Sequence, residues 1–181
     1  AEFTWKIGVG EYTNDRVITE LPVPGLAEYF QYSKNWRIQD LFALGNPWIR
    51  KPRSMSEVAI GSLLHIVQDS FAEGHVERRA PTGFTTCSNM PSGVLAPGRI
   101  VEFHSYANQD ADLHGNSDLR DAFSQQWTSD KPSSVDIGKY LLARFQAKDS
   151  WGSIKPYLEC VFALDRSPNN SSPGARYARG R

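Results

Sequence analysis

Histidine and aspartate recur at helical spacing in residues 61–75, which contain His65, Asp69 and His75. Residues four apart lie one above the other on a helix, so His65 and Asp69 could hold one cation between an imidazole nitrogen and a carboxylate oxygen. His75 comes six residues after Asp69 and would point about 240° away from it on an unbroken helix. We therefore expect Gly74 to end the helix, so that the chain can turn back.

A second set with the same four-residue spacing lies downstream. A histidine and an aspartate on the polar face of a single helix are usually just solvated, but a second set favours a shared metal ion. Imidazole nitrogen and carboxylate oxygen are the usual ligands of Zn²⁺ where no thiolate is offered. The sequence therefore predicts a zinc site built from two segments. The predicted metal ligands are His65, Asp69, His75, Asp110, His114 and Asp118.

The helix that must position the first set is amphipathic. At about 100° per residue, its apolar side chains fall within roughly 60° of one direction. They are Ile60, Leu63, Leu64, Val67 and Phe71. The pattern predicts a helix from Ser56 to about Ala72, with Ser54 or Ser56 as its N-cap. His65 and Asp69 point away from the apolar stripe.

The chain before this helix is less regular. Residues 1–25 lack long periodicity and end in several turn-forming residues, so we expect an extended arm or loop there. Residues 26–44 carry an apolar pattern that predicts a first helix, closed by Gly45-Asn46-Pro47.

After the first set, residues 80–98 are rich in Gly and Pro and predict a long loop, either a lid or a plain surface loop. A short segment then leads into a helix expected from Ser117 onward. Two further helices are predicted at Val135–Ala147 and Ser153–Leu164, because both stretches carry apolar stripes.

These elements predict a mostly α-helical fold, a single-domain helical bundle with long loops. Residues 1–165 would form a metal-dependent hydrolase-like domain, and residues 166–181 an Arg-rich tail without an apolar stripe. Lys plus Arg equals Asp plus Glu at 20 each, so no global field attracts nucleic acid or an anionic membrane. No run approaches the roughly 18 apolar residues of a membrane span, so we expect a soluble protein without stable membrane insertion.

The motif His65-x-x-x-Asp69-x-x-x-x-x-His75, followed by His114-x-x-x-Asp118, resembles the zinc-dependent phospholipase C and P1 nuclease superfamily. The resemblance covers roughly residues 57–120. It implies an all-helical fold that hydrolyses phosphodiesters with a cluster of zinc ions. It also implies that Asp69 is the bridging carboxylate and shares a metal with His65, while His75, His114 and Asp118 hold another zinc.

The chain departs from that family near its beginning. The family's mature chain starts with a Trp that binds metal through its amino group and carbonyl, and further histidine and aspartate ligands precede the first motif. Here Trp5 is internal and no histidine precedes His65. Either those ligands lie on a part not present in this sequence, or this is a reduced variant with one or two metals.

The resemblance implies a zinc-dependent phosphodiester hydrolase, phospholipase C-like, that uses metal-activated hydroxide, with Asp69 as its catalytic residue. The substrate would be a phospholipid head group or a nucleic acid. The absence of an aromatic-rich basic groove favours the lipid. The alternatives are a P1-type single-strand nuclease, or a non-catalytic, metal-stabilised helical interaction module, which the missing upstream ligands favour.

Some polar residues near the two sets have a structural and a functional interpretation. His104 is expected to be partly buried and hydrogen-bonded, or else to support a metal ligand or contact a substrate phosphate. Arg78 and Arg79 could approach a phosphate, although charged residues after a helix end are usually solvated. Cys87 and Cys160 either pair in an oxidising compartment or are two separate thiols. We expect a secreted or periplasmic protein.

Overall fold

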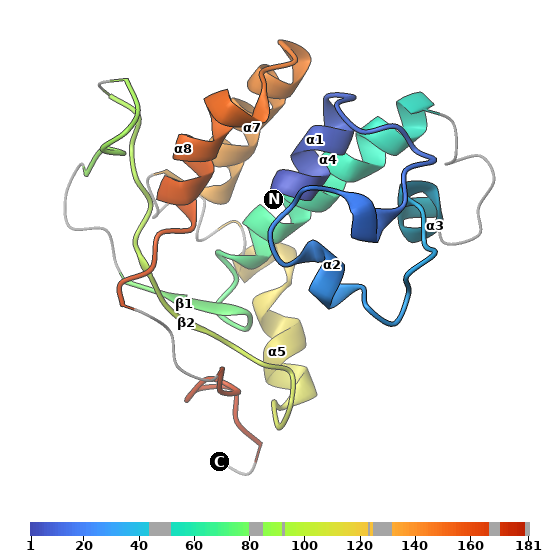
Figure 1. Cartoon of the computed structure of the whole chain (residues 1–181). Helices are drawn as coiled ribbons and strands as arrows, with labels where there is room; N and C mark the ends of the chain where they lie inside the picture. The colour runs from blue at the N-terminus through green and yellow to red at the C-terminus, as the bar shows by residue number, and fades with distance from the viewer. Residues whose placement is uncertain are drawn as a thin grey trace. The chain divides into compact units, whose positions relative to one another are not determined.

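The computed structural model describes residues 1–43, 52–79, 85–91, 93–122, 124, 132–166 and 171–179. The described part of the chain is mostly helical, with a minor antiparallel sheet of two strands, which confirms the predicted fold class (Figure 1). Its internal contacts divide it into two compact units. Unit 1 comprises residues 1–65 and 143–154, and unit 2 comprises residues 66–142 and 155–181.

Unit 1 begins with a short helix, α1 (Glu2–Gly8), so the expected arm was wrong for these residues. Phe3 and Ile7, one turn apart, are both buried. Trp5 is fully buried, and its indole Nε1 donates a hydrogen bond to the carbonyl of Asp149 at 2.9 Å. A helix this short contains a single apolar pair at four-residue spacing, so it leaves no long periodicity in the sequence.

The helix predicted over residues 26–44 was wrong in extent, because the structure has two short helices, α2 (Leu26–Tyr29) and α3 (Ile38–Ala43). The Asp40 carboxylate accepts a hydrogen bond from the backbone N–H of Arg37 at 3.0 Å. Satisfying a free N–H at this point favours a new helix start over continuation of the earlier one. The predicted stop at residues 45–47 lies outside the described residues.

Helix α4 (Pro52–Asp69) carries the first predicted ligand pair. It starts earlier than predicted, and Pro52 suits a first helical turn because its missing N–H has no partner to lose there. The predicted apolar stripe is confirmed, because all of its residues except the half-buried Leu64 are buried. Helix α4 ends at Asp69, before Ala72, so Gly74 is not the residue that stops it.

The core of unit 1 also includes the short 3-10 helix η1 (Ile18–Glu20). Side chains from η1, α1, α3 and the N-terminal half of α4 pack together. The cluster consists of Phe3, Ile7, Ile18, Leu21, Ile38, Met55 and Ala59. It fixes α4, whose last turn enters unit 2.

Unit 2 contains strands β1 (Val76–Arg78) and β2 (Ile100–Phe103), which pair antiparallel with Glu77 opposite Glu102. The sequence pattern did not predict this sheet, because three- and four-residue strands are too short to show alternation. The pairing places the chain that leaves α4 beside the chain that enters the second histidine and aspartate set (Figure 1).

Helix α5 (Ala111–Ser117) comes after β2, so the helix expected from Ser117 onward was wrong in its start. Residues 120–122 and 124, within the predicted range, are helical as well. Asp110 is its N-cap, and the carboxylate accepts hydrogen bonds from the backbone N–H groups of Asp112 and Leu113 at 3.0 and 3.1 Å. An aspartate in this position satisfies free N–H groups and favours the positive end of the helix dipole. Helix formation therefore starts at this cap.

The last two predicted helices are present. Helix α7 (Ser134–Gln146) matches its prediction within one residue at each end, whereas α8 (Trp151–Val161) starts two residues and ends three residues earlier than predicted. Among the described helices, none is both long enough and apolar enough to cross a bilayer.

A disulfide joins Cys87 to Cys160, so of the two interpretations of these cysteines the paired one is correct. It connects residues 85–91 to α8 within unit 2. Such bonds persist in oxidising compartments outside the cytosol.

Residues 171–179, expected to be part of a solvated tail, pack along residues 104–110 in unit 2. Ser105 N–H donates to the Ser172 carbonyl, and Asp110 N–H donates to the Tyr177 carbonyl, both at 2.7 Å. Tyr177 is buried. We call residues 171–179 the C-terminal strap. Residues 167–170, 180 and 181 of the predicted tail lie outside the described residues.

Candidate metal centre

Helix α5 positions two of the predicted ligands. His114 lies in its last turn and Asp118 is its C-cap residue, four positions later, so the two side chains face the same side. His114 Nε2 lies 3.4 Å from Asp118 Oδ2. The helix start at Asp110 thus sets the direction in which both side chains point.

The turn between α4 and β1 brings in the third ligand, His75. Gly74 in this turn lies against α5, since a Cβ on Gly74 would lie 3.1 Å from His114 Nδ1 and closer still to Ser117 Oγ. Its carbonyl accepts a hydrogen bond from Gln109 Nε2 at 2.8 Å. A glycine is needed here for close approach of the backbone, rather than to end the helix.

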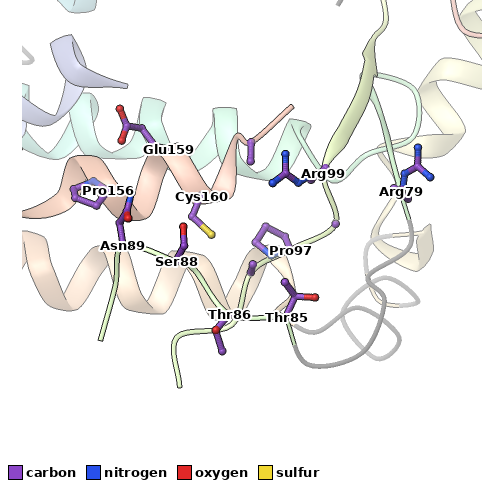
Figure 2. A pocket seen from close by; sticks show the side chains of 13 residues that line it. Arg79, Thr85, Thr86, Ser88, Asn89, Pro97, Arg99, Pro156, Glu159 and Cys160 are labelled. Carbon is purple, nitrogen blue, oxygen red and sulfur yellow. The ribbon is translucent and has the colours of Figure 1, made fainter. Parts of the chain in front are cut away.

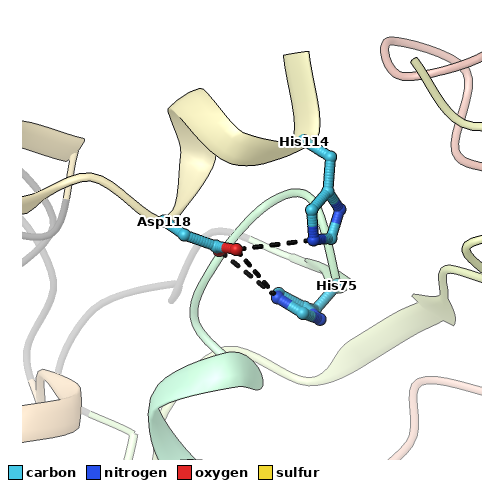
Figure 3. Close-up of side chains that lie close together, drawn as sticks. All are labelled: His75, His114 and Asp118. Carbon is cyan, nitrogen blue, oxygen red and sulfur yellow. Dashed lines mark hydrogen bonds and ion pairs between the residues drawn. The ribbon is translucent and has the colours of Figure 1, made fainter. Parts of the chain in front are cut away.

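His75, His114 and Asp118 converge on one point, as Figure 3 shows. His75 Nε2 lies 3.3 Å from Asp118 Oδ1 and 3.4 Å from Oδ2. The two imidazole rings have their centroids 4.6 Å apart. Both histidine side chains are mostly buried, 14% and 15% exposed, whereas the Asp118 side chain is 43% exposed. The cluster is therefore open to solvent on the side of the carboxylate.

These separations fit a bound zinc ion. A tetrahedral ion with bonds of about 2.0–2.2 Å holds its ligand atoms roughly 3.3–3.6 Å apart. The 3.3–3.4 Å between Asp118 oxygens and the two imidazole nitrogens falls in this range. A charge-assisted hydrogen bond would be shorter, about 2.7–2.9 Å. The donor set is also the one that zinc prefers in the absence of thiolates.

Tyr106 borders the three ligands. Its hydroxyl lies 3.2 Å from His75 Nδ1, and its ring centroid is 4.8 Å from that of His114. With Nε2 facing the ligand cluster, an Nδ1–H would donate to this hydroxyl oxygen and hold the ring in place. Partial burial, and then the negative charges of Asp69 and Asp118, raise the pKa of the Tyr106 hydroxyl above its ordinary value.

One buried atom of the cluster lacks a partner among the described residues. His114 Nδ1 is shielded from solvent and forms no hydrogen bond. His114 Nε2 faces Asp118, so the ring orientation places one nitrogen in the ligand cluster and leaves the other without a hydrogen bond. Such an uncompensated polar atom costs about 1–3 kcal/mol, which a metal bound by the same ring could offset.

The structure does not bring all predicted ligands together. Among the described residues, His65, Asp69 and Asp110 join no group of three or more ligand-type side chains with donor atoms within 4.8 Å. His65 is exposed and Asp69 half-buried, one turn apart on α4. Asp69 is still near enough to affect the pKa of Tyr106. Asp110 uses its carboxylate to cap α5. Metal binding by these three residues stays a prediction.

Arg78 does not extend toward the cluster as a free phosphate ligand. Its guanidinium donates to the carbonyls of Ser70, Gly98 and Val161, at 2.5, 2.7 and 3.0 Å, and to the Ser70 hydroxyl. It also lies over the Phe71 ring. Arg78 thus joins the end of α4, the chain before β2 and the end of α8 within unit 2. The suggestion that it binds phosphate is replaced by this structural role.

A separate cavity of about 280 Å³ lies beside the disulfide (Figure 2). Its cationic side chains are engaged, because Arg79 pairs with Asp165 at 2.5 Å and Arg99 donates to the Leu164 carbonyl at 3.0 Å. The cavity has no residue in common with the histidine cluster. Of the loop predicted over residues 80–98, either a lid or a plain surface loop, residues 80–84 and 92 lie outside the described residues.

The sequence pattern assigned no role to Gln109. Gln109 is buried, and its Nε2 bridges the carbonyls of Gly74 and Pro173, both at 2.8 Å. A polar residue within an irregular segment carries no periodic signal, so its burial could not be predicted.

Comparisons with known protein families, with curated proteins and with solved structures found no match for this chain. The function of the protein is therefore inferred from the geometry and chemistry of the cluster.

Proposed function

We propose that the protein is a zinc-dependent phosphodiester hydrolase, phospholipase C-like, in which His75, His114 and Asp118 hold a zinc ion. The observation that carries the proposal is the convergence of two imidazole nitrogens and one carboxylate, with nitrogen-to-oxygen distances in the range of a tetrahedral zinc ion. The resemblance of the spaced motifs to the phospholipase C and P1 nuclease superfamily supports the reaction class.

The number of ligands supports a catalytic role over a structural one. Structural zinc sites use four protein ligands, whereas catalytic sites use three and leave one position for water or substrate. Here three ligand-type residues converge, and Asp118 is the most exposed of them. A zinc ion in such a site supplies positive charge to phosphoryl oxygens and lowers the pKa of water toward 7.

The protein residues would have distinct tasks. His75 and His114 supply neutral nitrogens, and Asp118 supplies charge and faces both. Tyr106 fixes the His75 ring through its hydroxyl. The Tyr106 hydroxyl is protonated at neutral pH even at its ordinary pKa, and the upward shift of that pKa moves it further from neutral. The hydroxyl can therefore also donate to a substrate oxygen. Asp69, half-buried near Tyr106, is the proposed carboxylate that orients the attacking water.

The disulfide supports a secreted or periplasmic location, because such bonds are rare in reducing compartments. An extracytoplasmic hydrolase would meet phospholipids and nucleic acids alike. The phosphodiester is common to both, so the assay must include each of them.

The test begins with protein purified without chelator. Elemental analysis should find about one zinc or more per chain, and hydrolysis of a chromogenic choline phosphodiester should disappear with chelator and return with zinc. Single-stranded DNA is assayed in parallel, and the substrate that is hydrolysed faster decides between a phospholipase C and a nuclease. Zinc-loaded protein inactive on both would instead support a non-catalytic, metal-stabilised module. Protein that binds no zinc would refute the site.

A further inference from the structure

A second group of ligand-type residues lies on the two-stranded sheet, outside the centre described above. It consists of Glu77 on β1, Glu102 on β2, and His104 directly after β2. One donor atom from each lies within 4.8 Å of the other two. Glu102 and His104 are two residues apart in extended chain, so their side chains emerge on the same face, and Glu77 is directly opposite Glu102.

The pairing of the two glutamates is unfavourable by itself. Like charges directly opposite each other on neighbouring strands destabilise a sheet. Glu102 Oε1 accepts one hydrogen bond, from the backbone N–H of Ser172 at 3.1 Å. The Glu77 carboxylate on the opposite strand remains its neighbour. A cation between the two carboxylates would turn this repulsion into attraction.

The His104 ring provides the independent observation. Both of its nitrogens are shielded from solvent and have no hydrogen-bond partner among the described residues, although the sequence predicted a hydrogen-bonded ring. Gly174 covers the ring so closely that a Cβ on this glycine would lie 2.7 Å from His104 Cε1. The ring is therefore fixed, and burying two ring nitrogens without hydrogen bonds is unfavourable.

Direct pairing within the group does not satisfy His104. Its nitrogens form no hydrogen bond with either glutamate, although a donor atom of each is within 4.8 Å. Such a gap can be spanned by an ion that binds all three, after small rotations of the glutamate side chains. Glu77 is exposed and therefore free to adjust. One imidazole and two carboxylates suit Zn²⁺ or Mn²⁺ better than a soft cation.

We propose that Glu77, Glu102 and His104 form a second divalent-cation site, separate from the centre of His75, His114 and Asp118. The ion joins the two strands to each other and, through the Ser172 contact of Glu102, to the C-terminal strap. Its role is structural in the first place, because the carboxylates it neutralises are ladder partners.

The experiment isolates this site by using Asp118→Asn as the background, which weakens the first centre. Zinc binding to the full chain is measured by competition with a chromogenic chelator. We expect Asp118→Asn to retain a zinc equivalent. Adding Glu77→Gln should weaken the binding of that zinc by about 100-fold or more, the loss expected for one ligand. Glu28→Gln is the matched control, an exposed glutamate in unit 1 that should change nothing.

Two further measurements distinguish the loss of a zinc ligand from misfolding of the variant. Glu102→Gln retains an oxygen for the Ser172 N–H while removing the charge, and should lose the same zinc equivalent. In metal-free protein, Glu77→Gln should raise Tm or leave it unchanged, because it removes a repulsive charge pair. The proposal is overturned if Glu77→Gln binds zinc as tightly as its background, or if the Asp118→Asn background retains no zinc equivalent.

Discussion

Replacing His75 and His114 by alanine, singly and together, tests whether one ion joins the two segments. The rings are 4.6 Å apart at their centroids and both face Asp118 through Nε2. Three side chains at these separations can share one ion but leave no room for two ions ligated independently. Each single variant should therefore lose the same zinc, and the double variant should lose no more than one.

The expected loss of affinity depends on the number of ligands. Structural zinc sites with four ligands bind with about 10–16 kcal/mol, so each ligand accounts for roughly 2.5–4 kcal/mol. At about 1.4 kcal/mol per tenfold change, one lost histidine should weaken binding by roughly 100-fold to 1000-fold. The fold should survive in metal-free buffer, because the polar contacts of the two histidine side chains are mainly with Asp118 and Tyr106.

The assay combines zinc stoichiometry after desalting with a chelator competition titration on wild type, both single variants and the double variant. His65→Ala serves as a comparison, because His65 belongs to no ligand cluster among the described residues and should leave this ion bound. If the two single variants lose different ions, or if the double variant loses two, the shared centre does not exist. Full zinc content in either single variant would refute it as well.

Three further predictions concern neighbouring residues. Asp69→Asn should lower phosphodiester hydrolysis by roughly 100-fold or more while the fold survives, and full activity in this variant would place catalysis elsewhere. In metal-free protein, the pKa of Tyr106, raised by partial burial and by Asp69 and Asp118, should fall toward its ordinary value in Asp118→Asn. An ultraviolet difference titration of chelator-treated protein against Tyr106→Phe measures it, and an unchanged or higher value would contradict the assigned charge effect. Arg78→Lys keeps the charge but cannot reach three carbonyls at once, so the free energy of unfolding measured with urea should fall by about 2–4 kcal/mol. A change below about 0.5 kcal/mol would refute the structural role of Arg78.

The sequence predicted the parts of the fold that repeat over several turns. The stripe of α4, from Ile60 to Phe71, recurs often enough to identify the buried face. Helix α7 was located for the same reason. Helix α1 was missed because about two turns, with Phe3 and Ile7 as their apolar pair, are too short to show a period.

The candidate site was predictable to the extent that it depends on local spacing. The four-residue interval of His114 and Asp118 places them on one side of α5, which the structure shows. The same interval on α4 was given equal weight, yet His65 is exposed and joins no cluster among the described residues. Local spacing cannot distinguish the pair that joins a cluster from the pair that does not. The third member of the cluster, His75, is placed by a turn whose position depends on the packing of Gly74 and Gln109.

The C-terminal strap also affects the order in which the centre can be completed during synthesis. Asp110, which starts the helix that carries His114, is held by the Tyr177 carbonyl, and Gln109 needs the carbonyl of Pro173 as well as that of Gly74. Both acceptors on the strap leave the ribosome after every proposed ligand. A nascent chain would therefore expose its histidines before these contacts exist, and the complete scaffold can form only after residue 177 has left the ribosome.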